Sequence, residues 1–265
     1  YAQKLKKECT YSCNLSNGVM PKIMSASMEA FILEAQGQFV KAEKQWRNIL
    51  SLATSIRRRY PVHVIDNRTW LAINLMEQNR LVEAEFETRR VVKEVIGHAG
   101  KDSEATGRAV VWLGEILRKQ GRLEDAENLL KAGISIIENS DLPSDSYMMG
   151  HSRMLYGNVL TDQNYFTEAM KEFDRARTSL LHNQYLYEKV LARNQNLMLA
   201  LLKTGRIDEA IHMINSAYDI YRKNLGVNHY WTAEVSALNG IANLEMKRFK
   251  QAICDFSKSI PRSLR

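Results

Sequence analysis

The chain has 265 residues, 45% of them hydrophobic, and its 37 Lys and Arg exceed its 30 Asp and Glu to give a net charge of +7. This composition is typical of a globular protein, and the longest uncharged apolar runs fall far short of the roughly 20 residues that a membrane span needs. Three cysteines are too few for a disulfide framework. We therefore expect a cytoplasmic protein without membrane contacts.

Helices are predicted along nearly the whole chain, because Pro and Gly are few and apolar residues recur three and four positions apart. Residues 1–20 are predicted to be a partly helical segment that packs as an incomplete repeat. Beyond them one motif recurs: Gly or Asn, a basic residue, a bulky apolar residue, an acidic residue and Ala. This Ala falls at intervals of 41 to 43 residues, at Ala42, Ala84, Ala126, Ala169, Ala210 and Ala252.

Each period predicts two helices joined by a tight turn. Twelve residues before the recurring Ala lies a small residue such as Gly114, with Met198 as the exception, and four residues after it lies a bulky one such as Leu130, with Thr88 as the exception. A period of this length is typical of a solenoid, whose units must stack to bury their apolar faces. We predict an all-α, right-handed superhelical solenoid of six antiparallel helix-turn-helix repeats, forming a single domain over residues 21–265. The repeats are expected near 21–60, 61–101, 102–143, 144–183, 184–226 and 227–262.

Two resemblances follow from these motifs. The W-L-G of Trp112–Gly114, the G-R-L-x-x-A turn and the aromatic residue four positions later resemble the tetratricopeptide repeat. The long period and "NLGVNHYWTAE" from Asn224 resemble its kinesin-light-chain variety, which implies a superhelix that binds proteins or peptides in its concave groove. The turns "QGRLEDAE" and "LLKTGRIDEA" and the final "SKSIP" are similar to the repeat region of bacterial CHAT-domain (caspase-like protease) proteins. That similarity implies a sensor or regulatory role.

No catalytic constellation is visible in the sequence. It has no G-x-S-x-G, no Gly-rich phosphate loop and no H-E-x-x-H. A caspase-like pair of His98 and Cys254 would join an inter-repeat loop to the inside of a repeat helix. Cys9 and Cys13 lack the further ligands that zinc requires. We expect a protein that is not an enzyme and has no catalytic residues, metal or cofactor.

The repeat register predicts which residues line the concave groove. Positions eighteen, fifteen and eleven before the recurring Ala should face inward if the first helix of each repeat lines that side. Amide side chains there can satisfy the backbone of an extended peptide, and Met adapts to its side chains. The predicted groove residues are Arg108, Glu115, His151, Met154, Asn158, Asn194, Gln195 and Asn196. The alternative is that they form an ordinary hydrated helix face.

A second predicted surface lies at the helix starts, where Trp70, Tyr187, Tyr230 and Trp231 are either core residues or interaction hot spots. The expected partner is a protein or peptide, with a caspase-like protease domain in the same chain or a separate one as the finer prediction. A stand-alone peptide-sensing adaptor is one alternative. A basic nucleic-acid adaptor is less favoured, because the repeats show no base-reading code.

Overall fold

The computed structural model describes residues 18–58, 61–143, 145–181 and 183–259, and within them every regular element is an α-helix. The all-α prediction is confirmed. Most of the predicted N-terminal segment, residues 1–17, lies outside the described residues. None of the described helices is long and apolar enough to cross a membrane.

The chain divides into two compact units, Tyr1–Ser140 and Asp141–Arg265, and each is described by itself. Unit 1 contains α2 (Val19–Ala35), α3 (Phe39–Ser55), α4 (Pro61–Glu77), α5 (Leu81–Ala99), α6 (Glu104–Lys119) and α7 (Leu123–Glu138). Unit 2 contains α8 (Tyr147–Asp162), α9 (Phe166–Leu180), α10 (Gln184–Val190), α11 (Gln195–Lys203), α12 (Ile207–Leu225), α13 (Tyr230–Glu245) and α14 (Phe249–Ser259). That all six repeats form one continuous solenoid remains a prediction.

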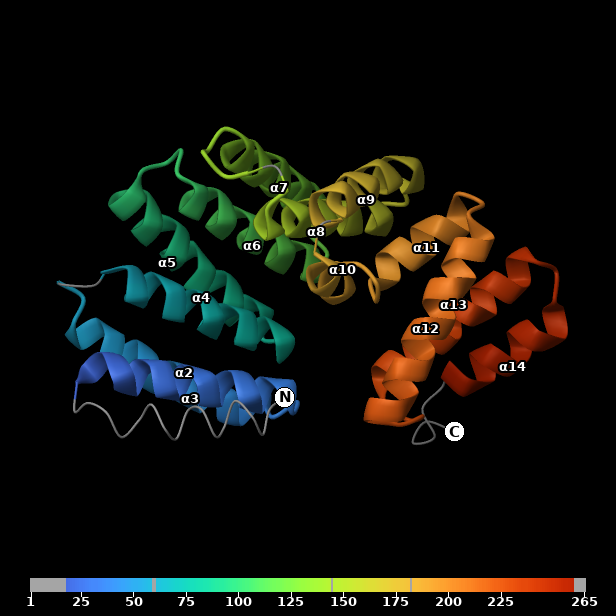
Figure 1. The fold of residues 1–265 in the computed structure, drawn as a ribbon, viewed down its shortest axis with the longest axis horizontal. Helices are drawn as coiled ribbons and strands as arrows, with labels where there is room; N and C mark the ends of the chain where they lie inside the picture. The colour runs from blue at the N-terminus through green and yellow to red at the C-terminus, as the bar shows by residue number, and fades with distance from the viewer. Residues whose placement is uncertain (1–17, 59–60, 144, 182, 260–265) are drawn as a thin grey trace. The chain divides into compact units, whose positions relative to one another are not determined.

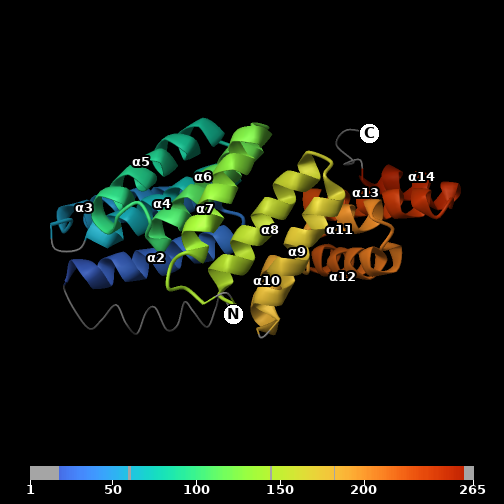
Figure 2. The same ribbon diagram turned by 90° about the horizontal axis from the view of Figure 1, so that it is seen from above.

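Consecutive helices pack in pairs, as the period predicts. In unit 1 the pairs are α2 with α3, α4 with α5 and α6 with α7, and the second helix of one pair also packs on the first helix of the next (Figure 1). In unit 2, α8 pairs with α9 and α13 with α14, while α11 contacts α8, α9, α12 and α13 (Figure 2). The repeats therefore stack within each unit.

The recurring Ala is buried in every pair, and in three pairs a glycine of the first helix faces a bulky residue of the second. All six recurring Ala residues are almost completely buried. A Cβ added to Gly114 would come within 2.9 Å of Leu130 Cγ, and one added to Gly157 would come within 2.7 Å of the Phe173 ring. These contacts leave no room for a larger side chain, so the paired helices approach more closely than bulkier residues would allow.

The turn inside each repeat contains one residue in the left-handed conformation. Its φ lies between 59° and 79° at Gly37, Asn79, Gly121, Asn164, Gly205 and Lys247. In the third repeat the Gly121 N–H donates to the Arg118 carbonyl at 2.9 Å, and the Arg122 N–H donates to the Leu117 carbonyl at 3.0 Å. This is the Schellman pattern that ends a helix. The conformation explains why the motif begins with Gly or Asn.

The fifth repeat departs from the predicted two helices. Its first helix is interrupted into α10 and α11, because the Asn194 side chain caps α11 by accepting the Leu197 N–H at 2.8 Å. Met198 occupies the place of the small residue and is completely buried.

Replacing Lys247 with Gly should stabilise the last repeat. A side chain in the left-handed region carries a steric penalty, partly offset by the freedom that Gly loses on folding, so the unfolding free energy should rise by about 0.5–1 kcal/mol. Urea unfolding measures this change. The matched control, Gly121→Lys, places the same strain in unit 1 and should lower stability. A Lys247→Gly variant that unfolds at lower urea than the wild type would contradict this account of the turn.

Candidate functional site

Side chains on two first helices of unit 1, α2 and α4, form a set that we call the first-helix face: Phe31, Glu34, Trp70, Asn74 and Glu77. The ring of Phe31 on α2 meets that of Trp70 on α4 edge-on, with centroids 4.9 Å apart. Asn74 Nδ2 on α4 donates to Glu34 Oε1 on α2 at 2.8 Å. Trp70, Asn74 and Glu77 follow one another at helical spacing, so they share one side of α4.

The aromatic part of this face is both rigid and accessible. Phe31 is 37% exposed and Trp70 is 39% exposed, whereas Trp46 from α3 is completely buried. Trp46 stacks with Trp70 at 6.3 Å between ring centroids and donates its Nε1–H to Glu34 Oε1 at 2.8 Å. The buried ring therefore fixes both the exposed indole and the carboxylate.

The negative charges of the two carboxylates on this face, Glu34 and Glu77, are only partly offset by favourable partners. Burial raises the pKa of Glu34 above its usual value, although hydrogen bonds from Asn74 and Trp46 act in the opposite sense. Surrounding protein atoms also raise the pKa of Glu77, with Lys119 opposing and the charges of Glu115 and Glu34 adding to the rise. Glu77 is nevertheless an exposed residue, so solvent screens its charge more than that of the half-buried Glu34. An approaching cation would therefore stabilise both carboxylates in their charged form.

The two predicted groove residues of unit 1 lie in different environments. Arg108 has 40% of its side chain exposed and lies 3.9 Å from Glu104. It also opposes the rise in pKa that burial imposes on Asp66. Glu115 is buried, and its carboxylate pairs with Arg118 at 2.8 Å. Arg108 is therefore accessible to a ligand, while Glu115 supports Arg118 from within.

In unit 2, the three predicted residues on α8 are buried. His151, Met154 and Asn158 are each at most 9% exposed, and the ring of His151 stacks on Tyr147 with centroids 5.5 Å apart. Asn158 Nδ2 lies 3.2 Å from Met154 Sδ. These side chains form the inner layer of the helix rather than its outer surface.

The predicted amides of unit 2 bind one another across α8 and α11. Asn194 Nδ2 donates to Asn158 Oδ1 at 3.0 Å. Asn196 Nδ2 donates to Asp162 Oδ1 at 2.7 Å and to the Asn158 carbonyl at 3.1 Å. Gln195, at the start of α11, is half-buried. The structure thus gathers Asn158, Asn194 and Asn196 into one network, in which they satisfy each other's hydrogen bonds.

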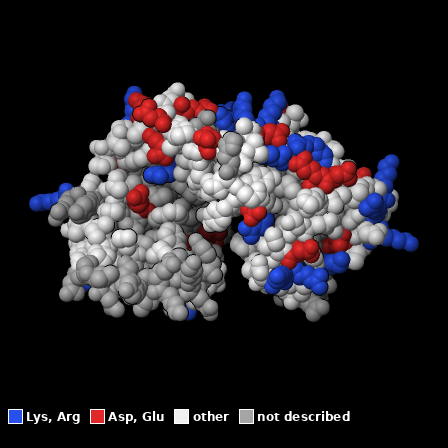
Figure 3. Space-filling model, viewed as in Figure 1, with Lys and Arg blue, Asp and Glu red and all other residues white. Residues whose placement is uncertain are grey.

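No group of three or more His, Cys, Asp or Glu in the described part of the chain is arranged to hold a metal ion. Cys9 and Cys13 lie outside that part. Cys254 is exposed on α14 in unit 2, whereas His98 lies on α5 in unit 1. On the face shown in Figure 3, Lys and Arg lie among Asp and Glu rather than in a single basic field.

The comparisons with protein families identify the repeat. Residues 190–264 and residues 107–132 each match a sequence model described as tetratricopeptide repeat. The chain therefore contains tetratricopeptide repeats, as the sequence resemblance implied. No curated protein matches the chain in sequence.

Several solved structures share this helical-repeat fold at low sequence identity. BtubC (BKLC) from P. vanneervenii is 15% identical with a TM-score of 0.56, over 97% of this chain and 87% of that one. A putative kinesin light chain from Podosopora anserina with nearly identical TPR-like repeats is also 15% identical, with a TM-score of 0.54 over 74% of this chain and 92% of that one. A Rap protein complexed with Competence and Sporulation Factor is 11% identical, with a TM-score of 0.65 over 92% of this chain and 64% of that one. These similarities establish the fold.

Replacing Glu34 with Gln should change the pH dependence of stability. Gln keeps an oxygen that accepts from Trp46 and Asn74 but carries no charge. Because the folded-state pKa is raised, ionising Glu34 opposes folding, and this penalty grows as pH rises from the usual value of 4.5 through the raised pKa. The variant should therefore gain stability over the wild type as pH rises, as measured by urea unfolding between acidic and neutral pH.

The matched control for that variant is Glu83→Gln. A hydrogen bond from Arg80 lowers the pKa of Glu83, so this carboxylate stabilises the fold at neutral pH and loses that effect as pH falls through its lowered pKa. The Glu83→Gln variant should therefore lose stability relative to the wild type as pH rises. A difference between the Glu34→Gln variant and the wild type that does not vary with pH would contradict the raised pKa.

Replacing Asn158 with Ala should destabilise unit 2. The change leaves the Asn194 amide without its acceptor and opens space beneath α11, so we expect a loss of about 1–3 kcal/mol in unfolding free energy. Asn215→Ala on the exposed side of α12 is the control and should change stability by less than about 0.5 kcal/mol. Equal effects of the two substitutions would show that the amide network does not hold α8 to α11.

Proposed function

We propose that this chain is a non-enzymatic, cytoplasmic scaffold that binds a protein or peptide along the first helices of its repeats. The tetratricopeptide repeats support this proposal, since stacked helix pairs create extended surfaces suited to binding. The Rap protein of similar fold was solved with a bound factor, which supports the same use of the fold.

The observation that carries the proposal is the exposed Trp70 beside the under-compensated carboxylates of Glu34 and Glu77. A Lys or Arg side chain can lie over the indole face, where the ring's negative potential attracts it. The same cation would form charge-assisted hydrogen bonds to the carboxylates, which are strengthened where solvent is partly excluded. We therefore infer that the partner segment presents at least one Lys or Arg to unit 1.

The predicted groove residues take two different roles in this proposal. Arg108, Asn194, Gln195 and Asn196 are partly exposed, so they are the proposed contacts with the partner. Glu115, His151, Met154 and Asn158 are buried. Asn158 bonds to Asn194 and Asn196, so we propose that it positions these two contacts, whereas the other three support the first helices from within.

A pair of synthetic peptides tests the proposal. One is an acetylated and amidated peptide of alternating Lys and Ala, and the other has Glu in place of each Lys. The chain's net charge of +7 repels cations at long range, so binding of the Lys peptide would report a local site. Calorimetry should detect binding of the Lys peptide but not of the Glu peptide.

Variants locate the binding site. Trp70→Ala should weaken binding of the Lys peptide by about fivefold, the effect of losing roughly 1 kcal/mol of cation–π attraction. Tyr185→Ala removes another exposed aromatic residue, in unit 2, and should leave the affinity unchanged. Equal binding of the two peptides, or full affinity after Trp70→Ala, would contradict the proposed site.

A finer proposal is that the scaffold is the sensor or regulatory region of a bacterial CHAT-type protease system. It is supported by the turn sequences, which are similar to those of the repeat regions in such proteins. Adding the repeat chain to a CHAT-type protease domain should change the rate at which that domain cleaves its substrate. An unchanged rate would favour the alternative of a stand-alone peptide-sensing adaptor, which the likeness to the Rap complex supports.

A further inference from the structure

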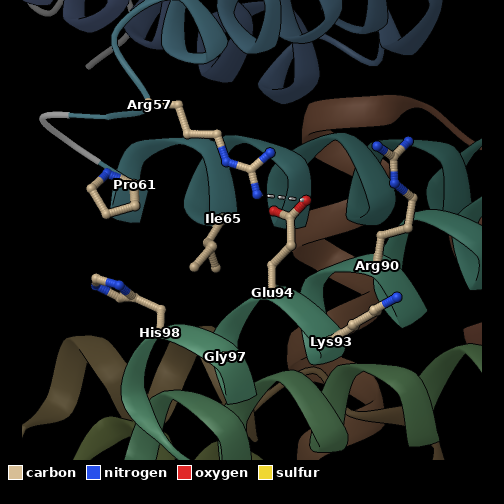
Figure 4. Close-up of a pocket in the computed structure, with 8 residues that line it drawn as sticks. All are labelled: Arg57, Pro61, Ile65, Arg90, Lys93, Glu94, Gly97 and His98. Carbon is tan, nitrogen blue, oxygen red and sulfur yellow. Dashed lines mark ion pairs between the residues drawn. The ribbon is translucent and has the colours of Figure 1, made fainter.

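A second candidate site lies in unit 1, away from the first-helix face. A cleft of about 600 Å³ is formed where α3 ends, α4 begins and α5 nears its end. Figure 4 shows Arg57 reaching toward Glu94, with Ile65 beside them, His98 near Pro61, and Arg90 and Lys93 on the opposite side. The size is that of a small-molecule site, which typically spans roughly 300–1,000 Å³.

The cleft carries an excess of positive charge. Arg57, Arg90 and Lys93 line it, and Glu94 is its only acidic lining residue among those described. The neighbouring buried Arg68 is already paired with Glu87 at 2.6 Å. Arg57 lies 3.8 Å from Glu94, longer than a hydrogen bond, and about half of its side chain is exposed. Its guanidinium is therefore available to an anion.

Two buried polar atoms at this site lack a hydrogen-bond partner within the protein. They are Glu94 Oε2 and Arg68 Nε, and Arg68 Nη2 lies 3.6 Å from Glu94 Oε1. Such unsatisfied atoms are rare, because each carries a desolvation penalty. The Glu94 carboxylate, whose side chain is 16% exposed, still requires a hydrogen-bond donor, whereas the surrounding cations require an acceptor. A ligand group that offers both would satisfy the site.

We propose that this cleft binds a phosphate group in its monoprotonated form. The phosphate oxygens would accept from Arg57 and Lys93, and the remaining P–OH would donate to the partly exposed Glu94 carboxylate. A phosphomonoester has a second pKa of about 6, so this form is available near neutral pH. Sulfate has the same shape but no proton at that pH, so it would face the Glu94 carboxylate without a hydrogen bond. The cleft is larger than one phosphate, so the phosphate would be attached to a larger group lying against Ile65.

The first test is a comparison of phosphate with sulfate. The whole chain is titrated with inorganic phosphate and with sodium sulfate by calorimetry at one ionic strength and at about pH 6.5, where inorganic phosphate carries at least one P–OH and sulfate carries none. Phosphate should bind at least about tenfold more tightly, the effect of one satisfied charge-assisted hydrogen bond. Simple charge attraction would instead favour the dianionic sulfate. Equal or tighter binding of sulfate, or no binding of either ion at millimolar concentrations, would overturn the proposal.

Variants assign the roles of the residues. Glu94→Gln should remove the preference for phosphate over sulfate. The amide of Gln can donate to sulfate and carries no charge that repels it, so the affinity for sulfate should rise. Lys93→Ala should weaken phosphate binding, while Lys44→Ala, which removes an equal charge from the exposed side of α3, should not. If Glu94→Gln leaves the preference intact, Glu94 is not the acceptor of the proton. Phosphate binding that resists Lys93→Ala would place the ion elsewhere.

The source of the phosphate is distinguished with two further probes. A phosphoserine peptide and a nucleoside monophosphate are titrated separately against the wild type and Glu94→Gln. Tighter binding of the peptide than of inorganic phosphate would assign a phosphorylated protein segment, and tighter binding of the nucleotide would assign a small phosphorylated molecule. If neither binds more tightly than inorganic phosphate, the proposed attached group is wrong.

Discussion

Every repeat depends on a short turn that reverses the chain through one residue in the left-handed conformation. The turn fixes the register between the two helices, so that the recurring Ala is buried in every repeat and, in three repeats, a glycine of the first helix meets a bulky residue of the second. Where Gly157 faces Phe173, the ring occupies the place where a Cβ would stand. The spacing of the surface residues follows from this register, since each first helix is held at a defined rotation on its partner.

The sequence predicts the features that depend on local geometry. The period, the turn residues and the small–bulky pairs all follow from residues within one repeat, and the structure contains each of them. The interruption in the first helix of the fifth repeat is indicated less strongly by the sequence than these features are. Asn194 is a good helix cap, but an Asn in a helical pattern can equally well remain inside the helix.

The candidate site was predicted less well, because contacts between repeats depend on how far each helix is rotated and shifted against the next. Register alone placed Asn158 in the groove, whereas the neighbouring helix α11 covers it and supplies Asn194 as its partner. Phe31 occupies the predicted inward position of the first repeat, eleven residues before Ala42. That position was the only feature of the sequence that pointed to Phe31 as a surface residue of the site. The compensation of Glu34 by Trp46 and Asn74 joins three helices and cannot be seen in any single repeat.

The proposed scaffold binds a cation although its net charge is positive, so binding depends on the local charges of Glu34 and Glu77 beside Trp70. The most direct measurement is the pKa of Glu34, obtained by carbon NMR with and without the alternating Lys–Ala peptide. The account predicts a raised pKa in the free chain and a lower one in the complex, because a bound cation stabilises the carboxylate. An ordinary pKa in the free chain, or a raised pKa that the peptide does not change, would contradict it.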